Sequence, residues 1–569
     1  MNNKGLFAAS LFFLSEAVLA VDTPQSALPS TSQPSQVQRA LISELPKQQP
    51  TPTSIQEPTQ AEASQVGEQA KKITFKLTNI ILTGNHVYSH AQLERLYIKD
   101  INQIISVADL YNIVQRITNY YRNNGYILSR AILPPQHVAH GVVRVQVIEG
   151  FISKANVIGE PKYAKSVVER YAQHIVNSRP LQLKVMEHYL LIANEIPGVQ
   201  TKAVLEPSKT IPAAAELNLQ TETKTVTGFL SYDDYGTRYI GPQQITLNLG
   251  TNSLWVSGDT LQGIGAKTPK GMELSFYDVS YNVPISNEGL RWIFDTNKAM
   301  TNPLFTLAPL KINGTVMTYD TQFQYPVIRT PSKSLTVQGG FNYMDSQTLS
   351  FDAPLYLDHL RTLTLGTTYN FADSLKGVNG LTLTLGKGIP LFGATISTKS
   401  LTTSRYGASG VFTDFNFNYN RLQTLFWRFS LYGVAQGQYS FNPLLVSQQF
   451  AYGGSQLGRG YDPAEITGDD GLAGSVELRF DLTPGWRLLQ SIQIYTFYDV
   501  GETWYLKQVS GQPPRQSATS TGGGIRFSFN EYLSGNFMIA QPLTRKVAAE
   551  ELIGNGRLPR TFFSIVAML

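Results

Sequence analysis

From about residue 226 to its end, the chain consists of short runs in which apolar and polar residues alternate, for example 244–249, 381–385 and 414–419. A period of two is typical of β-strands with one apolar and one polar face. The polar partners are mainly Thr, Asn, Gln, Ser and Gly rather than charged residues, which favours an outer-membrane barrel with a wet lumen over a soluble sandwich. We therefore expect residues 225–569 to form an all-β transmembrane barrel of about sixteen antiparallel strands.

The N-terminal part of the chain has the composition of processed and flexible segments. Residues 1–20 predict a secretory signal peptide, with Lys4, an apolar core and a small-residue end at Ala20. Residues 21–70 are rich in Pro, Ser, Thr and Gln and predict a flexible linker. Within this linker, residues 36–45 are bounded by prolines and could form a short helix.

Two successive segments, 71–150 and 151–224, have the element order β-α-α-β-β and are interpreted as an internal repeat of small α+β domains. In the first segment we expect a strand over 73–82, a helix over 89–99 and a strand over 126–133. Small repeated domains with exposed sheet edges bind extended chains by strand addition. The pair of units therefore suggests a site for a polypeptide partner.

A Gly-rich connection over residues 450–474 separates two alternating runs, 425–431 and 476–481. It is longer than a usual hairpin loop, and such long loops are often functional. Arg459 stands between two glycines, which allow a close backbone approach to another surface. We expect this loop to pack against another surface rather than to be mobile.

Composition and motifs argue against most catalytic chemistry. The chain has no cysteine, so disulfides, thiolate metal sites and Cys nucleophiles are excluded. The segment 380–388 lacks the spacing of a phosphate loop, and 453–457 lacks the last glycine of a nucleophile elbow. His359 is the one histidine of the barrel region, which disfavours an outer-membrane hydrolase. We predict no catalytic, cofactor or metal site and no nucleic-acid partner. The net charge of +5, without blocks of like charge, argues neither for nor against nucleic acid.

Several motifs together resemble a known family. The chain is similar to the outer-membrane transporters of two-partner secretion, the haemolysin/haemagglutinin secretion-activation family, within the superfamily of POTRA-plus-barrel proteins. The resemblance covers about residues 73–569. The motifs that carry it are YRNNGY at 121–126, SRAILPPQ at 129–136, VIEG at 147–150, IPGV at 196–199, YDDYG at 232–236, YNVP at 281–284, residues 454–470 and FYDVG at 497–501.

The resemblance implies two POTRA domains in the periplasm and a sixteen-stranded barrel in the outer membrane of a Gram-negative bacterium. It implies transport of a large exoprotein, haemolysin- or adhesin-like, recognised through its N-terminal secretion domain. In the family the long loop folds into the lumen and its arginine contacts an aspartate, which here means Arg459, Gly460 and Tyr461 against Asp499. The family also often has an N-terminal helix that plugs the barrel, and residues 36–45 are the candidate for it here. Alternation agrees, because Asp499 shares the luminal face with Tyr495.

Further expectations concern partners and an alternative function. Client-binding strand edges are expected around Tyr126, Ile132, Val199 and Leu205. Outer-membrane lipid and the general barrel-assembly machinery are the other expected partners. The alternative reading is a barrel-assembly insertase of the same superfamily, which more than two POTRA units would favour. Gly458 stands where the family usually has an apolar residue, which predicts a looser loop tip.

Overall fold

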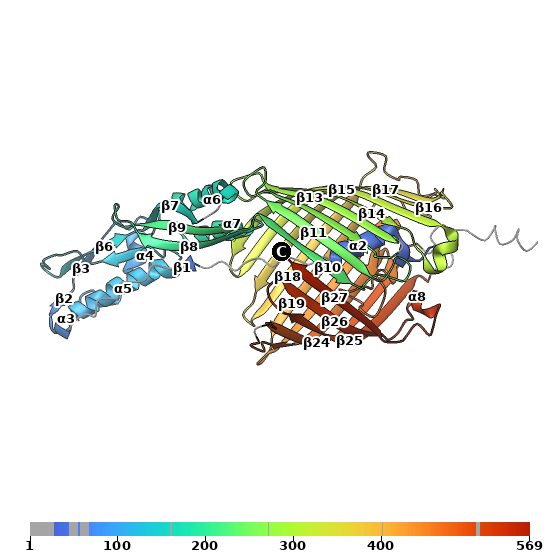
Figure 1. Ribbon diagram of the computed structural model, residues 1–569. Coiled ribbons are helices and arrows are strands. Elements are labelled where there is room, and N and C mark those ends of the chain that lie inside the picture. Colours follow the sequence, from blue (N-terminus) through green and yellow to red (C-terminus); the bar gives the residue numbers. More distant parts are fainter. Residues whose placement is uncertain are drawn as a thin grey trace, which may run out of the picture.

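The structure is a computed structural model of the chain, and it describes residues 28–44, 55–56, 68–159, 162–270, 272–400, 402–486, 488–507 and 513–569. The predicted signal peptide and much of the predicted linker lie outside the described residues. Figure 1 shows two α+β units in a row beside one end of a barrel. We call the barrel end beside these units the near end and the opposite end of the barrel the far end.

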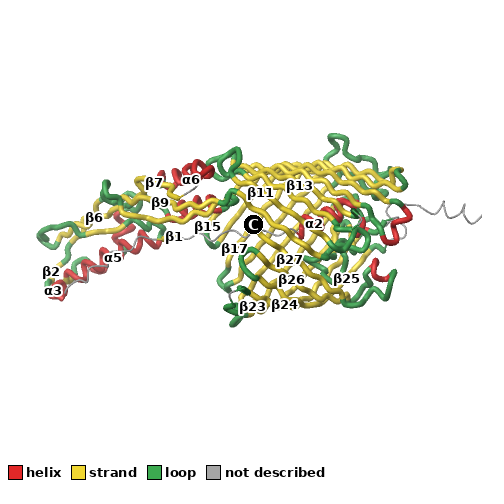
Figure 2. Tube along the Cα trace, in the orientation of Figure 1, coloured by secondary structure: helices red, strands yellow, loops and turns green. Residues whose placement is uncertain are grey.

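Sixteen antiparallel strands close into one barrel, as predicted. Consecutive barrel strands pair along the chain, and Figure 2 shows them in yellow around the cylinder. β10 pairs with β27 to close it. The strands are β10 (Val226–Asp233), β11 (Gln244–Asn252), β12 (Thr260–Lys267), β13 (Leu274–Pro284), β14 (Arg291–Thr301), β15 (Ile312–Thr330), β16 (Lys333–Ser350), β17 (Ala353–Ala372), β18 (Gly377–Gly388), β19 (Thr413–Thr424), β20 (Phe429–Ser440), β23 (Asp470–Leu482), β24 (Ser491–Trp504), β25 (Arg515–Ser528), β26 (Leu533–Pro542) and β27 (Arg560–Met568).

The alternation in sequence becomes a difference between the outer and the luminal face. On β11 the side chain of Leu247 is 46% exposed, whereas its neighbour Asn248 is 1% exposed and faces the lumen. Apolar side chains outside and neutral polar side chains inside are the pattern of a barrel that meets lipid and encloses water. The described helices include none that is long and apolar enough to cross a membrane.

Two predicted boundaries around the long loop were wrong. Residues 425–428 form a tight turn, in which Trp427 has a positive φ of 53°, so the strand begins at Phe429. The loop spans 441–469 rather than 450–474, because β23 already starts at Asp470. The glycines near residue 471 suggested that the loop continues to residue 474. However, Gly471 belongs to the wall strand β23, where a Cβ would lie 2.0 Å from the Phe450 ring, so this glycine makes room for the loop.

The first α+β unit contains two small sheets instead of one. The predicted strand over 73–82 is divided, because the backbone changes partner at Leu77 and Thr78 from Gln103 to Gly141. The predicted helix over 89–99 ends at Glu94, and of the predicted strand over 126–133 only Arg130–Ile132 is paired. The elements are α3 (Glu68–Lys72), β2 (Thr74–Lys76), β3 (Asn79–Thr83), α4 (His90–Glu94), β4 (Ile104–Ser106), α5 (Val107–Asn123), β5 (Arg130–Ile132) and β6 (Val142–Ile148).

The second unit follows the predicted order β-α-α-β-β, and its sheet has one additional strand. The order in the sheet is β1-β8-β9-β7, where the added edge strand comes from residues 55–56 of the N-terminal segment. Two helices cover the sheet and enclose an apolar core that includes Val167, Tyr171 and Leu190. The elements are β1 (Ile55–Gln56), β7 (Phe151–Gly159), α6 (Lys165–Asn177), α7 (Leu183–Asn194), β8 (Val199–Pro207) and β9 (Ala214–Thr223).

The second unit is attached to the near end of the barrel. Glu195, just after α7, accepts a 2.5 Å bond from Arg329 of β15. The Val167 amide donates to Ser257 in the β11–β12 turn at 3.2 Å. These contacts fix the orientation of the unit relative to the lumen.

A helix from the N-terminal segment lies inside the barrel. α2 (Pro34–Glu44) packs against β14, β15 and β16, toward the far end (Figure 1). It begins at Pro34, two residues earlier than predicted, because proline is well tolerated in the first turn of a helix. Val37 and Leu41 contact an apolar cluster of the wall that includes Tyr239 and Leu274.

Candidate functional site

The loop between β20 and β23, residues 441–469, folds back into the lumen. Its two arms form a short antiparallel pair, β21 (Phe450–Tyr452) with β22 (Ile466–Gly468). Apolar side chains of the loop pack against small residues of the wall, Ala473 and Ala518. The tip of the loop, residues 457–463, is therefore held deep in the barrel.

Arg459 at the tip forms a two-pronged ion pair with Asp499 on β24. Its Nε donates to Asp499 Oδ2 at 3.0 Å and its Nη2 to Asp499 Oδ1 at 2.8 Å. Arg459 is 5% exposed and Asp499 is fully buried. The guanidinium also lies 3.5 Å above the centre of the Phe497 ring. Such charge-assisted, bidentate pairs are the strong and geometrically specific ones.

Glu477 on β23 is a second acceptor for the same guanidinium, which sequence reasoning missed as a site residue. Arg459 Nη1 donates to Glu477 Oε2, while Arg479 and Arg526 each bond Glu477 Oε1 at 2.7 Å. The guanidinium is effectively always protonated in proteins, so the tip arginine is charged at every physiological pH.

The glycines of the tip tighten it rather than loosen it. Gly458 has φ of 81°, and its amide donates to Asp499 Oδ2 at 3.1 Å, beside the Arg459 amide at 2.9 Å. A Cβ at Gly458 would lie 2.8 Å from the Tyr452 ring. The expected loosening by Gly458 is thus wrong, because the left-handed backbone is what aims two amides at the carboxylate.

The residues after Arg459 bind the wall on the other side of the tip. The Gly460 amide donates to Ser520 Oγ of β25 at 3.3 Å, and the Tyr461 hydroxyl donates to the Thr519 carbonyl at 2.9 Å. Asp462 accepts a 2.6 Å bond from Arg560 at the start of β27. The tip therefore contacts four wall strands, β23, β24, β25 and β27.

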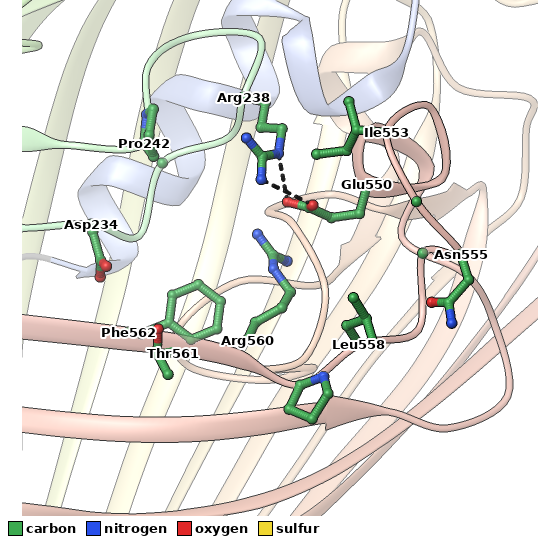
Figure 3. A pocket seen from close by; sticks show the side chains of 14 residues that line it. Asp234, Arg238, Pro242, Glu550, Ile553, Asn555, Leu558, Arg560, Thr561 and Phe562 are labelled. Atoms are coloured by element: carbon green, nitrogen blue, oxygen red, sulfur yellow. Dashed lines mark hydrogen bonds and ion pairs between the residues drawn. The ribbon is translucent and has the colours of Figure 1, made fainter.

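Arg560 lies where the barrel closes. The β10–β27 seam has five residue pairs, from Phe229↔Met568 to Asp233↔Ser564. Beyond Asp234, whose amide still donates to the Phe563 carbonyl at 3.3 Å, the two segments separate around a hollow of about 380 Å³. Figure 3 shows Arg238 and Glu550 meeting across this hollow, with bonds of 2.7 and 3.1 Å.

The helix in the lumen contacts the same loop. Gln36 Nε2 donates to the Val446 carbonyl at 2.6 Å and Arg39 Nη1 to the Gln449 carbonyl at 2.7 Å. Ser455 Oγ donates to Glu44 Oε1 at 2.8 Å. α2 and the loop thus fill the lumen together. The space left between Arg39 and the wall strands β18 to β20 is a hollow of about 330 Å³.

The predicted client-binding edges differ in their surroundings. Tyr126 lies in a turn, not on a strand edge, and its hydroxyl accepts a 2.7 Å bond from Gln182 of the second unit. Ile132 ends the edge strand β5. Val199 and Leu205 are buried on β8, whose outer edge is paired at Ala203 and Val204 with β1.

The described residues contain no group of three or more His, Cys, Asp or Glu that could hold a metal ion.

The sequence profile of the haemolysin secretion/activation protein family (ShlB/FhaC/HecB) matches residues 215–527, more than half of the chain. The chain belongs to this family. A second profile, for ShlB-type POTRA domains, matches residues 75–150. This member of the family is therefore an outer-membrane transporter that exports an exoprotein by two-partner secretion, with its POTRA domains in the periplasm.

Relatives agree with this assignment, and a solved structure has the same fold. The heme/hemopexin transporter protein HuxB of Haemophilus influenzae (strain ATCC 51907 / DSM 11121 / KW20 / Rd) is 23% identical, over 94% of each chain. The outer membrane transporter CdiB of Dickeya dadantii is 22% identical, over 78% of each. The solved structure of CdiB from Escherichia coli has a TM-score of 0.70 at 17% identity, covering 90% of this chain and 93% of that one. Because the POTRA domains are periplasmic, the near end of the barrel is periplasmic and the far end is extracellular.

A structure of BamA from Haemophilus ducreyi, without POTRA domains 1–3, has a TM-score of 0.50 and 12% identity, covering 87% of this chain and 100% of that one. This likeness concerns the fold alone. The family profile, together with relatives that are transporters, favours export over the alternative function of barrel assembly. Members of the family are transporters rather than enzymes.

Proposed function

We propose that this transporter rests in a closed state, in which α2 and the Arg459 loop occupy the lumen, and that a large exoprotein displaces α2 when it is exported. The observation that supports this best is the position of α2 inside the barrel, bonded to Val446 and Gln449 of the loop. In this proposal Arg459, Gly460, Tyr461 and Asp499 hold the loop as a fixed part of the channel wall. No enzymatic step is needed.

The exoprotein is recognised in the periplasm by strand addition to the POTRA domains. An unpaired strand edge offers backbone donors and acceptors to an extended client, and alternate side-chain positions give specificity. The edge of β5 at Ile132 is one such place, although the Ala131 amide of this strand already donates to Thr118 Oγ1 at 3.0 Å. The edge of β8 is a second place, but β1 covers it at Ala203 and Val204. The N-terminal secretion domain of the exoprotein would have to compete with β1 there.

Two further partners belong to this proposal. Outer-membrane lipid covers the outward side chains, of which Leu249 and Val500 are typical. The general barrel-assembly machinery inserts the folded barrel.

Competition at β8 predicts that a soluble fragment 71–224, which lacks β1, binds the secretion domain several-fold more tightly than fragment 54–224. Both units have their own apolar cores, so each fragment should fold. The matched control is fragment 54–224 with Ile55→Pro, in which a β1 amide is lost, and it should approach the affinity of 71–224. Affinities are measured by calorimetry at low and moderate salt.

Equal affinities of the two fragments would contradict competition at β8. Affinity that collapses between low and moderate salt would contradict strand addition as the main attraction, because salt screens surface charge rather than backbone hydrogen bonds.

A further inference from the structure

A second buried ion pair lies in the extracellular loops, away from the tip of the Arg459 loop. Arg405 belongs to the loop between β18 and β19, residues 389–412, and Asp469 is the last residue of the loop 441–469. Arg405 Nη1 donates to Asp469 Oδ1, and both side chains are 0% exposed. A buried arginine and a buried aspartate are tolerated only when each has a partner.

The pair joins three extracellular loops. Arg405 also donates to the Leu444 carbonyl at 3.2 Å and to the Lys507 carbonyl at 2.9 Å. Asp469 accepts the Leu444 amide at 2.8 Å and the Leu506 amide at 2.9 Å. Arg405 and Asp469 therefore each bond two loop segments. One segment contains Leu444 and precedes β21, and the other, residues 506–507, follows β24.

The Arg405–Asp469 pair holds residues 444–449, and α2 forms hydrogen bonds with this same segment. Residues 444–449 present the carbonyls of Val446, Ser447 and Gln449 to Gln36 and Arg39 of α2. On its other side the same segment is held by Arg405 at Leu444, and by its neighbour Ser404, which accepts the Val446 amide at 3.1 Å. Leu444 and Leu445 are fully buried beside Ala408 and Phe412.

We propose that Arg405 and Asp469 are positioning residues for α2: they hold residues 444–449 in the place where the helix can bond their carbonyls. A hydrogen bond weakens steeply when its distance or angle departs from the optimum. Loss of the pair frees the segment, and α2 then loses the acceptors for Gln36 and Arg39 together. This inference rests on the proposed plugging of the lumen by α2, and it adds the residues that keep the plug in place.

The test compares single-channel conductance of the full-length protein in planar bilayers among four proteins. These are the unchanged chain, Arg405→Ala, a deletion of residues 28–44, and the two changes combined. Arg405→Ala should raise conductance toward that of the deletion, and the combined protein should conduct no more than the deletion alone, because the two changes act through one element. Arg421→Ala, which removes the Arg421–Asp373 ion pair at the periplasmic turn, is the matched control and should leave conductance unchanged.

A second readout follows α2 directly. The chain has no cysteine, so Val37→Cys introduces a single thiol on the buried side of α2. Its reaction with a maleimide should be slow in the unchanged background and at least tenfold faster with Arg405→Ala or with Asp469→Asn. Asp469→Asn removes the charge and keeps the shape, so it decides the question if Arg405→Ala yields no heat-modifiable barrel.

The outcomes separate this inference from the proposed plug. If the deletion of 28–44 leaves conductance unchanged, α2 is not a plug and both proposals fall. If the deletion opens the pore while Arg405→Ala and Asp469→Asn conduct and label like the unchanged protein, the plug stands and the positioning role is overturned. Conductance that rises further in the combined protein would also overturn it, since the pair would then shape the exit rather than α2.

Discussion

Arg459→Ala is expected to reduce exoprotein release at least about tenfold while the barrel remains folded in the outer membrane. The change removes four side-chain hydrogen bonds, to Asp499, Glu477 and Ser475, from a buried site. A hydrogen bond to a charged group is worth about 1.5–3 kcal/mol, and a factor of ten needs about 1.4 kcal/mol. The barrel itself keeps the hydrogen bonds between its sixteen strands, so the change displaces the loop rather than unfolding the barrel.

The measurement is exoprotein released into the medium per heat-modifiable barrel in the membrane. Arg459→Lys should recover only part of the release, because a point charge cannot reproduce the planar fork that bonds Asp499 and Glu477 together. Arg421→Ala is again the control for loss of an ion-paired arginine. Normal release by Arg459→Ala at normal barrel abundance would refute the role of the loop.

An exchange of charges should fail to rescue release. With Arg459→Asp and Asp499→Arg combined, the new aspartate would lie beside Glu477, and the new arginine could not accept the Gly458 and Arg459 amides that Asp499 accepts.

Deletion of residues 28–44 is expected to produce a several-fold larger and steadier conductance. A sixteen-stranded barrel has an aqueous lumen unless something fills it. α2 fills part of the lumen, and Gln38 of α2 bonds Thr318 of the wall strand β15 at 3.2 Å. Single-channel recordings in planar bilayers measure the change.

The control for this deletion is Ser43→Ala. The Ser43 hydroxyl bonds Ala40 of the same helix, so its loss should leave α2 docked and conductance unchanged. Equal conductance before and after the deletion would show that α2 does not obstruct the pore.

The sequence was sufficient to predict the barrel because its alternation reports the environment of each side chain. Tyr498 and Val500 are outward and exposed, while Phe497 and Asp499 are luminal and buried, as their period of two requires. Predictions based on glycine were less reliable. Gly471 belongs to the wall and Gly458 tightens the tip, because a glycine can mark the close approach of another group as well as a loop.

The remaining features depend on partners that only the fold brings together. Arg405 and Asp469 are 64 residues apart, and Arg560 and Asp462 are 98 residues apart. One feature of the sequence could have indicated the ion-pair network around Glu477. Glu477 is a carboxylate on the polar face of a strand, whereas the polar faces of the barrel strands carry mostly neutral residues. The pairing of β1 with β8 had no such signal, since residues 55–56 lie in a stretch rich in Pro, Thr and Gln.

The passage of the exoprotein through the lumen can be tested most directly by crosslinking. An exoprotein stalled during export is crosslinked in cells to a single cysteine at one of two adjacent positions of β18. Thr384 lines the luminal hollow beside Arg39, whereas Leu385 is outward and 45% exposed. Crosslinks to Thr384→Cys, with none to Leu385→Cys, are the predicted result. Crosslinks to Leu385→Cys alone, or equally to both, would contradict transport through the lumen.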